Sequence, residues 1–142
     1  MAEATASGKV AFELVAPERV LASERVDMVV APGTDGDFGV LPEHSHLMSL
    51  LRPGIIEIHE GERITQRIFV GGGFAEVNET GCTVLAEEAM PVREIDVEAA
   101  QKRLRLAKDD LGSVEDEVAR SRIERDIAIA EAMIEAASTS AG

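Results

Sequence analysis

The sequence predicts an α+β protein in two parts, an N-terminal all-β domain followed by an antiparallel α-helical hairpin. From residue 9 to residue 92, short runs of β-forming residues alternate with Gly, Pro, Asp and Asn, which is typical of a β-sandwich or barrel. After Pro91 the apolar residues recur every three or four positions, which is the spacing of amphipathic helices. We therefore expect a sandwich domain at 9–92, a helix-turn-helix domain at 93–137, and frayed ends at 1–8 and 138–142.

The all-β domain contains runs that alternate between apolar and polar residues, as at 56–59, and this alternation directs one face of a strand inward. Gly61 and Gly81 stand between such runs, where glycine supplies the positive φ that tight hairpin turns require. Antiparallel neighbours are therefore expected. The candidate strands are 9–15, 19–22, 25–31, 46–52, 55–60, 63–70, 74–78 and 81–87.

The helical domain follows the segment from Glu88 to Glu94, which we expect to be a linker because it contains Pro91. Asp96 is a suitable N-cap for a first helix. Gly112 and Ser113 predict a helix stop followed at once by a second N-cap, and so short a connection favours antiparallel helices. The apolar lines of the two helices are Val97, Ala100, Leu104, Ala107 and Leu111, and Ile123, Ile127, Ala130, Ile134 and Ala137.

Composition excludes several functional classes. The chain has 14 Lys and Arg against 27 Asp and Glu, a net charge of -13 that repels phosphate backbones, so nucleic acid is not an expected partner. It has no Trp or Tyr on which bases or sugars could stack. The single Cys82 suits a reducing compartment. No apolar run approaches the roughly 20 residues that cross a bilayer, so direct membrane insertion is not expected.

The residues that could carry chemistry do not form a recognisable catalytic or metal site. His44 and His46 have the spacing of a metal pair but lack a third clustered ligand, and Cys82 is best explained as a small buried hydrophobe. The glycines 71–73 lack the lysine and the helix start of a phosphate loop. The residues alone therefore predict an interaction or structural subunit. The alternative that stays open is a stand-alone ligand- or metal-binding β-sandwich with a helical lid.

Several motifs together resemble one family. The segment 36–47, Gly-Asp-Phe-Gly-Val-Leu-Pro-Glu-His-Ser-His-Leu, resembles the Gly-x-hydrophobic-Gly-aliphatic-x-Pro-x-His-x-Pro-Leu signature of the epsilon subunit of bacterial F-type ATP synthases, with His46 where the family often has proline. Residues 51–56, 71–77 and 84–87 are similar to the family's Lys/Arg-Pro-Gly strand start, its Gly-Gly-x-x-Glu-Val segment and its last strand, in the same order. The resemblance extends from residue 9 to residue 137 and is specific because several ordered motifs agree.

This resemblance implies a β-sandwich of two sheets and about ten strands, followed by a helix-turn-helix. It also implies a non-catalytic rotor subunit in the central stalk. Such a subunit links the gamma subunit to the c-ring, transmits torque during proton-driven ATP synthesis, and lies peripherally at the cytoplasmic face of the bacterial inner membrane.

The resemblance also implies contact residues for three partners. The c-ring would meet the loop residues Asp37, Phe38 and His44. The gamma subunit would meet Gly72, Gly73 and Glu76. In relatives, basic residues of the hairpin meet catalytic beta subunits and limit ATP hydrolysis, and here these would be Lys102, Arg103, Arg105 and Lys108. The residues themselves leave open a solvated loop, close packing of the glycines and a solubilising helix face.

Some members of the family bind ATP through an Ile/Leu-Asp-x-x-Arg-Ala motif. The corresponding run here is 95–100, in which Ala99 stands where the motif has arginine. Alanine has neither the charge nor the forked donors that an arginine offers to phosphate. We therefore expect weak or no ATP binding, and no cofactor.

Overall fold

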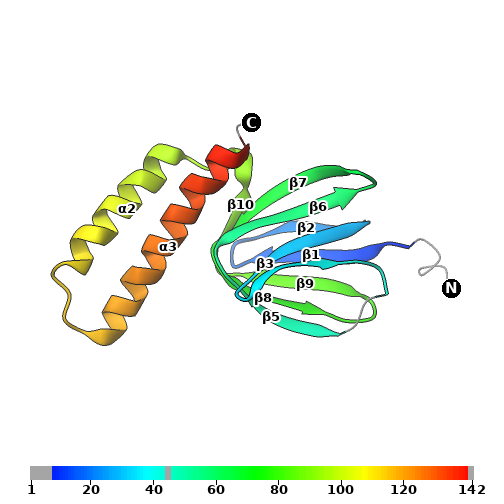
Figure 1. Cartoon of the computed structure of the whole chain (residues 1–142), viewed down its shortest axis with the longest axis horizontal. Helices are drawn as coiled ribbons and strands as arrows, with labels where there is room; N and C mark the ends of the chain where they lie inside the picture. Colours follow the sequence, from blue (N-terminus) through cyan, green and yellow to red (C-terminus); the bar gives the residue numbers. More distant parts are fainter. Residues whose placement is uncertain (1–7, 44–45, 141–142) are drawn as a thin grey trace. The chain divides into compact units, whose positions relative to one another are not determined.

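The computed structural model describes residues 8–43 and 46–140, and it divides the chain into two compact units with a boundary between Pro91 and Val92 (Figure 1). The first unit consists of strands and the second of helices. In the described part of the chain, no helix combines the length and the apolar character needed to span a membrane.

Ten strands form one continuous hydrogen-bonded network in the order β10-β7-β6-β3-β5-β8-β9-β1-β2, with β4 attached to β3. β2, at one end of this order, contacts β6 and β10 near the other end, so the network folds back on itself as a sandwich (Figure 1). The predicted fold class is therefore confirmed. The strands are β1 (Val10–Ala16), β2 (Arg19–Val26), β3 (Met28–Gly33), β4 (Gly36–Val40), β5 (Leu47–Leu51), β6 (Gly54–Glu60), β7 (Arg63–Val70), β8 (Gly73–Val77), β9 (Gly81–Ala86) and β10 (Ala89–Pro91).

β3 joins the two halves of the network. Its first residues pair with β6, whereas its last residue, Gly33, pairs with Leu51 of β5. Between β5 and β6 the chain bends at Arg52 and Pro53, and proline cannot donate a ladder hydrogen bond there. This bend is therefore a corner at which the chain passes from one half of the network to the other.

The structure corrects three expectations about the strands. β4 lies in a segment that was expected to be a loop, and β1 pairs with β9 in parallel rather than antiparallel. The segment from Glu88 to Glu94 is not a free linker, because Ala89–Pro91 pairs with β7 and Val92–Glu94 forms the 3-10 helix η1. Pro91 is tolerated because β10 is a short strand at the end of the network.

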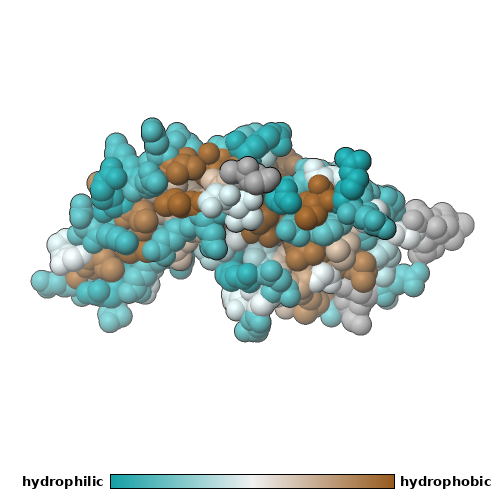
Figure 2. Space-filling view, turned by 45° about the horizontal axis from the view of Figure 1, so that its top comes forward, coloured by the Kyte–Doolittle hydropathy of each residue, from teal (hydrophilic) through white to brown (hydrophobic). Residues whose placement is uncertain are grey.

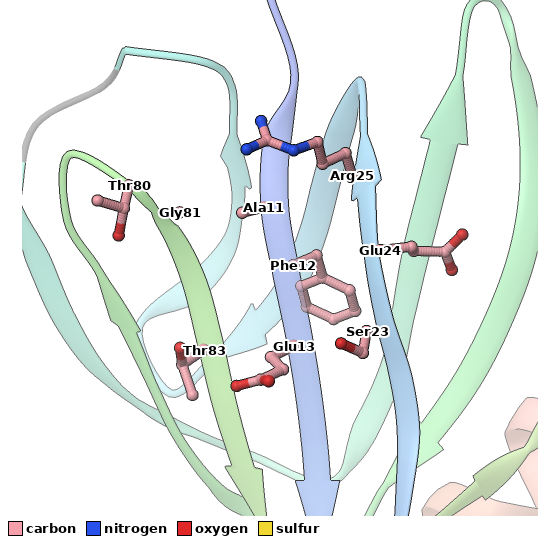
Figure 3. A pocket seen from close by; sticks show the side chains of 9 residues that line it. All are labelled: Ala11, Phe12, Glu13, Ser23, Glu24, Arg25, Thr80, Gly81 and Thr83. Carbon is pink, nitrogen blue, oxygen red and sulfur yellow. The ribbon is translucent and has the colours of Figure 1, made fainter. Parts of the chain in front are cut away.

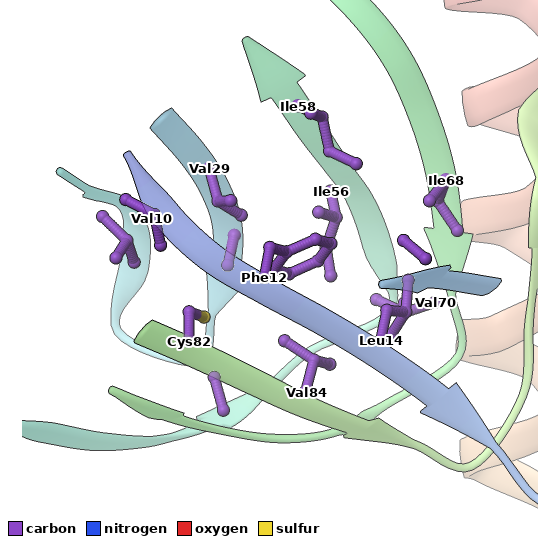
Figure 4. Packing of buried hydrophobic residues seen from close by; sticks show 14 of the residues in the cluster. Val10, Phe12, Leu14, Val29, Ile56, Ile58, Ile68, Val70, Cys82 and Val84 are labelled. Carbon is purple, nitrogen blue, oxygen red and sulfur yellow. The ribbon is translucent and has the colours of Figure 1, made fainter. Parts of the chain in front are cut away.

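Aliphatic side chains from both layers fill the core, together with Phe12 from β1 (Figure 4). Phe12 is 2% exposed, and Leu14, Ile56 and Ile58 are fully buried. Cys82 belongs to the same cluster and, as predicted, is a small buried side chain. Burial raises the pKa of its thiol to about 11, so the thiol stays protonated at neutral pH.

The second unit contains α2 (Val97–Leu111) and α3 (Glu117–Ser140), which pack against each other. The predicted N-cap of α2 is confirmed, because Asp96 Oδ1 accepts a hydrogen bond from the Ala99 amide at 3.1 Å. Between the helices, Arg103 of α2 forms a salt bridge with Asp126 of α3, with Arg103 Nε 2.7 Å and Nη2 2.5 Å from Asp126 Oδ1.

The connection between the helices is longer than the sequence predicts. Residues 112–116 separate the helices, and the cap of α3 is Asp116, whose Oδ2 accepts from the Ala119 amide at 2.9 Å. Ser113, the expected cap, instead donates its hydroxyl to the Asp110 carbonyl at 3.3 Å. α3 continues to Ser140, past residue 137, where the helical domain was expected to end.

Candidate functional site

The structure places Asp37 and Phe38 in strand β4, which corrects their expected position in a loop. β4 forms a hairpin with β3, with Thr34 and Asp35 in the turn. Asp37 is exposed, whereas the half-buried Phe38 packs against the sandwich core. His44 lies outside the described residues.

Arg52, at the corner between β5 and β6, holds this hairpin. Its Nη2 lies 2.6 Å from Asp37 Oδ1, and its Nη1 donates to the Gly33 carbonyl at 2.5 Å. The Arg52 amide also donates to the Pro32 carbonyl at 2.9 Å. The Asp37 carboxylate therefore forms an intramolecular ion pair with Arg52, although it is accessible to solvent.

Of His44 and His46, whose spacing alone suits a metal pair, only His46 lies in the described part of the chain. His46 is exposed, and its partner His44 is not described. Within residues 8–43 and 46–140, no three His, Cys, Asp or Glu side chains lie close enough together to hold a metal ion.

The expected gamma-contact residues divide into two kinds. Gly72 and Gly73 have φ of +110° and +135°, and a Cβ at Gly73 would collide with the Leu85 carbonyl oxygen. These glycines are therefore required by the backbone of the sandwich. Glu76, by contrast, is exposed on the outer face of β8, where its carboxylate is accessible to another molecule.

A row of apolar residues crosses the outer face of five strands beside Glu76. Leu50 of β5 pairs with Phe74 of β8, Phe74 with Leu85 of β9, Leu85 with Val15 of β1, and Val15 with Val20 of β2. Leu50 is 68% exposed, Leu85 44% and Val20 60%. Figure 2 shows apolar side chains reaching the surface of the strand unit. We call these five residues the apolar row.

The apolar row is not among the features that the sequence predicts, although one signal for it is present. An outer strand face normally carries polar residues, but β5 reads Leu-Met-Ser-Leu-Leu, with apolar residues on both faces. The cross-strand register then shows that this second apolar face continues over β8, β9, β1 and β2.

A shallow groove lies on the same outer face, over β9, β1 and β2 (Figure 3). It is hollow because the paired residues Ala11 and Gly81 are small, and a Cβ at Gly81 would collide with the Ala11 carbonyl oxygen. Glu13, Glu24 and Arg25 also line it. The groove therefore gives the outer face a charged region beyond the apolar row.

The four basic residues of α2 are not equivalent. Lys102, Arg105 and Lys108 are exposed, whereas Arg103 is half-buried and grips Asp126. Arg103 thus holds the two helices together. Ala99 lines a groove between the helices together with Arg103 and Asp126, so a basic group in that groove already faces a carboxylate.

The described residues thus carry an exposed apolar row on one face of the strands, and the fold is that of a β-sandwich with a C-terminal helical hairpin. Residues 9–92 match the family model described as "ATP synthase, Delta/Epsilon chain, beta-sandwich domain". The chain therefore belongs to the ATP synthase epsilon chain family.

Similar proteins agree with this family. The ATP synthase epsilon chain of Rhodospirillum rubrum is 50% identical over 125 residues, which cover 88% of this chain and 93% of that relative. The epsilon chain of Paramagnetospirillum magneticum is 47% identical over 125 residues, covering 88% and 94%. A chain in the cryo-EM structure of the Euglena gracilis mitochondrial ATP synthase (OSCP/F1/c-ring) is 30% identical, with a TM-score of 0.76 and coverage of 91% of this chain and 81% of that chain.

Proposed function

We propose that this protein is a non-catalytic rotor subunit in the central stalk of an F-type ATP synthase, where it joins the gamma subunit to the c-ring and transmits torque. It would lie peripherally at the cytoplasmic face of the membrane. Two facts support this proposal: the family of the chain, and the c-ring that the structure of the similar Euglena gracilis chain contains. A close-packed aliphatic sandwich is stiff enough to transmit force.

The observation that carries the proposal is the apolar row. Exposed apolar patches with polar surroundings mark protein interfaces, because burying them releases water. We propose that the gamma subunit covers this row. Glu76, two residues after Phe74 in β8, would make a polar contact at the rim of that interface. Gly72 and Gly73 would then contribute by shaping β8 rather than by direct contact.

We propose that the c-ring meets the part of the sandwich that carries the β3–β4 hairpin. The turn residues Thr34 and Asp35 are exposed, together with Asp37. A polar contact of this kind suits a partner made of repeated identical subunits. Phe38 would support the hairpin from within, and His44 remains a candidate for the same contact.

The helical hairpin is proposed to limit ATP hydrolysis through Lys102, Arg105 and Lys108, which could meet acidic residues of a catalytic beta subunit. Arg103 is proposed to hold α2 to α3 instead. ATP binding is expected to be weak or absent, because the Ala99 side chain offers no donors and the Arg103 guanidinium is already bound by Asp126. Calorimetry on the full chain measures this directly, and a dissociation constant near micromolar would contradict it.

The gamma interface is tested by placing a charge in the apolar row. Leu50→Asp and Leu85→Asp should each reduce co-purification with the gamma subunit by about tenfold or more, because the carboxylate would be buried unpaired. Val118→Asp on α3 is the matched control, since Val118 is 66% exposed and Leu50 is 68% exposed. Full recovery of gamma with both row variants would contradict the assignment.

A further inference from the structure

The Arg52 side chain makes two polar contacts that link separate segments of the sandwich. It stands at the corner between β5 and β6, and its guanidinium reaches back to the β3–β4 hairpin. One nitrogen donates to the Gly33 carbonyl at 2.5 Å and another contacts Asp37 Oδ1 at 2.6 Å. The fork therefore binds both strands of the hairpin at once, one on each side of the turn.

Few backbone hydrogen bonds join the outer half of this hairpin to the rest of the sandwich, although Phe38 packs against the core. β6 pairs with β3 only at 28–30, and in the described part of the chain β4 pairs with β3 alone. Beyond that, the Thr34 amide donates to the Leu50 carbonyl at 3.0 Å, the Arg52 amide donates to the Pro32 carbonyl at 2.9 Å, and Gly33 pairs with Leu51. Arg52 adds the side-chain fork to these few backbone bonds.

We propose that Arg52 is a positioning residue that fixes the direction in which the β3–β4 hairpin projects, and thereby sets its contact with the c-ring; this inference rests on the proposed function. A planar guanidinium can bond a carbonyl and a carboxylate simultaneously in fixed directions, whereas a lysine ammonium is a single point charge. Because Arg52 and Asp37 are both solvent-accessible, their ion pair contributes little to global stability. Its effect is local.

The experiment compares Arg52→Ala and Arg52→Lys, with Arg63→Ala as control, since Arg63 is an exposed arginine in a different hairpin. In the full chain, Arg52→Ala should accelerate exchange of the Thr34 amide about fivefold or more. The amide of core residue Ile58 and the melting temperature should stay unchanged. Arg52→Lys should restore part of the protection, and Arg63→Ala should have no effect.

The second arm uses the assembled complex, with Asp35→Cys and a cysteine in the polar loop of the c-ring. Asp35 is chosen because replacing Asp37 would itself break the Arg52 pair. Arg52→Ala should lower the yield of oxidative crosslinking several-fold, and Arg52→Lys should lower it less. The remaining Cys82 is buried and protonated, so it should not compete.

The two arms separate the possible failures. Unchanged Thr34 exchange in Arg52→Ala overturns the positioning role, and so does faster exchange with an unchanged crosslinking yield. If Arg52→Ala accelerates exchange but Asp35→Cys alone never crosslinks to the ring, then Arg52 still orders the hairpin and the proposed ring contact is wrong.

Discussion

At the scale of single residues, the charged side chains of Lys9, Asp27 and Glu60 link three different segments of the sandwich. Lys9 Nζ lies 2.9 Å from Asp27 Oδ1 and 2.9 Å from Glu60 Oε1, while Asp27 Oδ2 accepts from the Gly61 amide at 2.5 Å. The hydrogen bonds from Lys9 and Gly61 lower the pKa of Asp27. The hydrogen bonds to Asp27 and Glu60 raise the pKa of Lys9. Both shifts mean that folding favours the charged forms.

The first prediction concerns Asp27→Asn, which should lower the melting temperature at pH 7. Because the folded pKa of Asp27 lies below the unfolded value, its stabilising effect is present above about pH 3.9 and is lost as the pH falls through the folded pKa. The folded pKa of Lys9 lies above the unfolded value, so its stabilising effect is fully present below about pH 10.4 and is lost as the pH rises through the folded pKa. Thermal unfolding from pH 2.5 to 7 should show the two proteins converging at low pH; a constant difference would contradict this assignment.

The second prediction concerns Gly81, which faces Ala11 of the neighbouring parallel strand. Gly81→Ala should destabilise the protein by about 2–4 kcal/mol, because its Cβ would collide with the Ala11 carbonyl oxygen and backbone would have to move. Gly39→Ala is the control, since the nearest atom to its Cβ would be Met28 Sδ at 3.7 Å, and its effect should stay below about 1 kcal/mol. Denaturant unfolding measures both, and equal losses would show that backbone crowding at Gly81 is not the cause.

At the scale of elements, small residues decide how closely α2 and α3 approach. The ion pair between Arg103 and Asp126 fixes which turns of the two helices lie side by side. Ala100 lies about one turn before Arg103 in α2, and Ala130 lies about one turn after Asp126 in α3. Because the helices are antiparallel, Ala100 and Ala130 therefore lie at the same height along the hairpin. Ala100 is 2% exposed and Ala130 is fully buried. The helices therefore approach through methyl groups.

The third prediction is that Ala130→Leu forces the helices apart and destabilises the helical unit by about 1–3 kcal/mol. Ala128→Leu is the matched control, because Ala128 is exposed on the same helix and the same alanine-to-leucine change there carries the same difference in helix propensity. Loss of helical circular dichroism on heating should begin earlier in Ala130→Leu alone. Identical melting of the two variants would mean that this helix face tolerates larger side chains.

Most elements could be predicted from local patterns, and the ones that were missed have physical reasons. β4 reads Gly-Asp-Phe-Gly-Val, in which two glycines and one aspartate remove the alternation that identifies a strand. β10 has three residues and ends in proline, so its pairing with β7 depends on tertiary position rather than propensity. The sequence favours Ser113 as the cap of α3, but Asp116 is also a good cap, and only the path of the backbone selects between them.

The candidate site was less predictable than the fold. Apolar alternation identifies the face of a strand that points inward, but the apolar row requires the register of five strands, and two of them, β1 and β9, are paired in parallel across the domain. The link between Arg52 and Asp37 likewise joins two connections that no local pattern relates. The family motifs include both Asp37 and Arg52, but they do not indicate that the two side chains form an ion pair.

At the scale of the whole molecule, the two units should be separable, which is the fourth prediction. A chain that ends after Glu94 retains β10 and should fold, attach to the gamma subunit and support ATP synthesis, with any change confined to ATP hydrolysis. A chain that ends after Glu88 loses β10 and leaves the β7 backbone at 68–70 without this partner, so it should melt at a lower temperature. Synthesis lost in the longer truncation, despite correct folding, would place the joint in the helical hairpin.

The parallel pairing of β1 with β9 also determines when the sandwich can form during translation. β1 and β2 emerge first and can pair locally, but the other backbone edge of β1 has no strand partner until Gly81–Ala86 has been made. At roughly 5–20 residues per second, the nascent β1–β2 hairpin waits roughly 3–12 s for its second neighbour, and such non-local pairing is slow to form. Ribosome-bound chains that end before β9 should therefore be the ones that require a chaperone, and synthesis of β9 should release them.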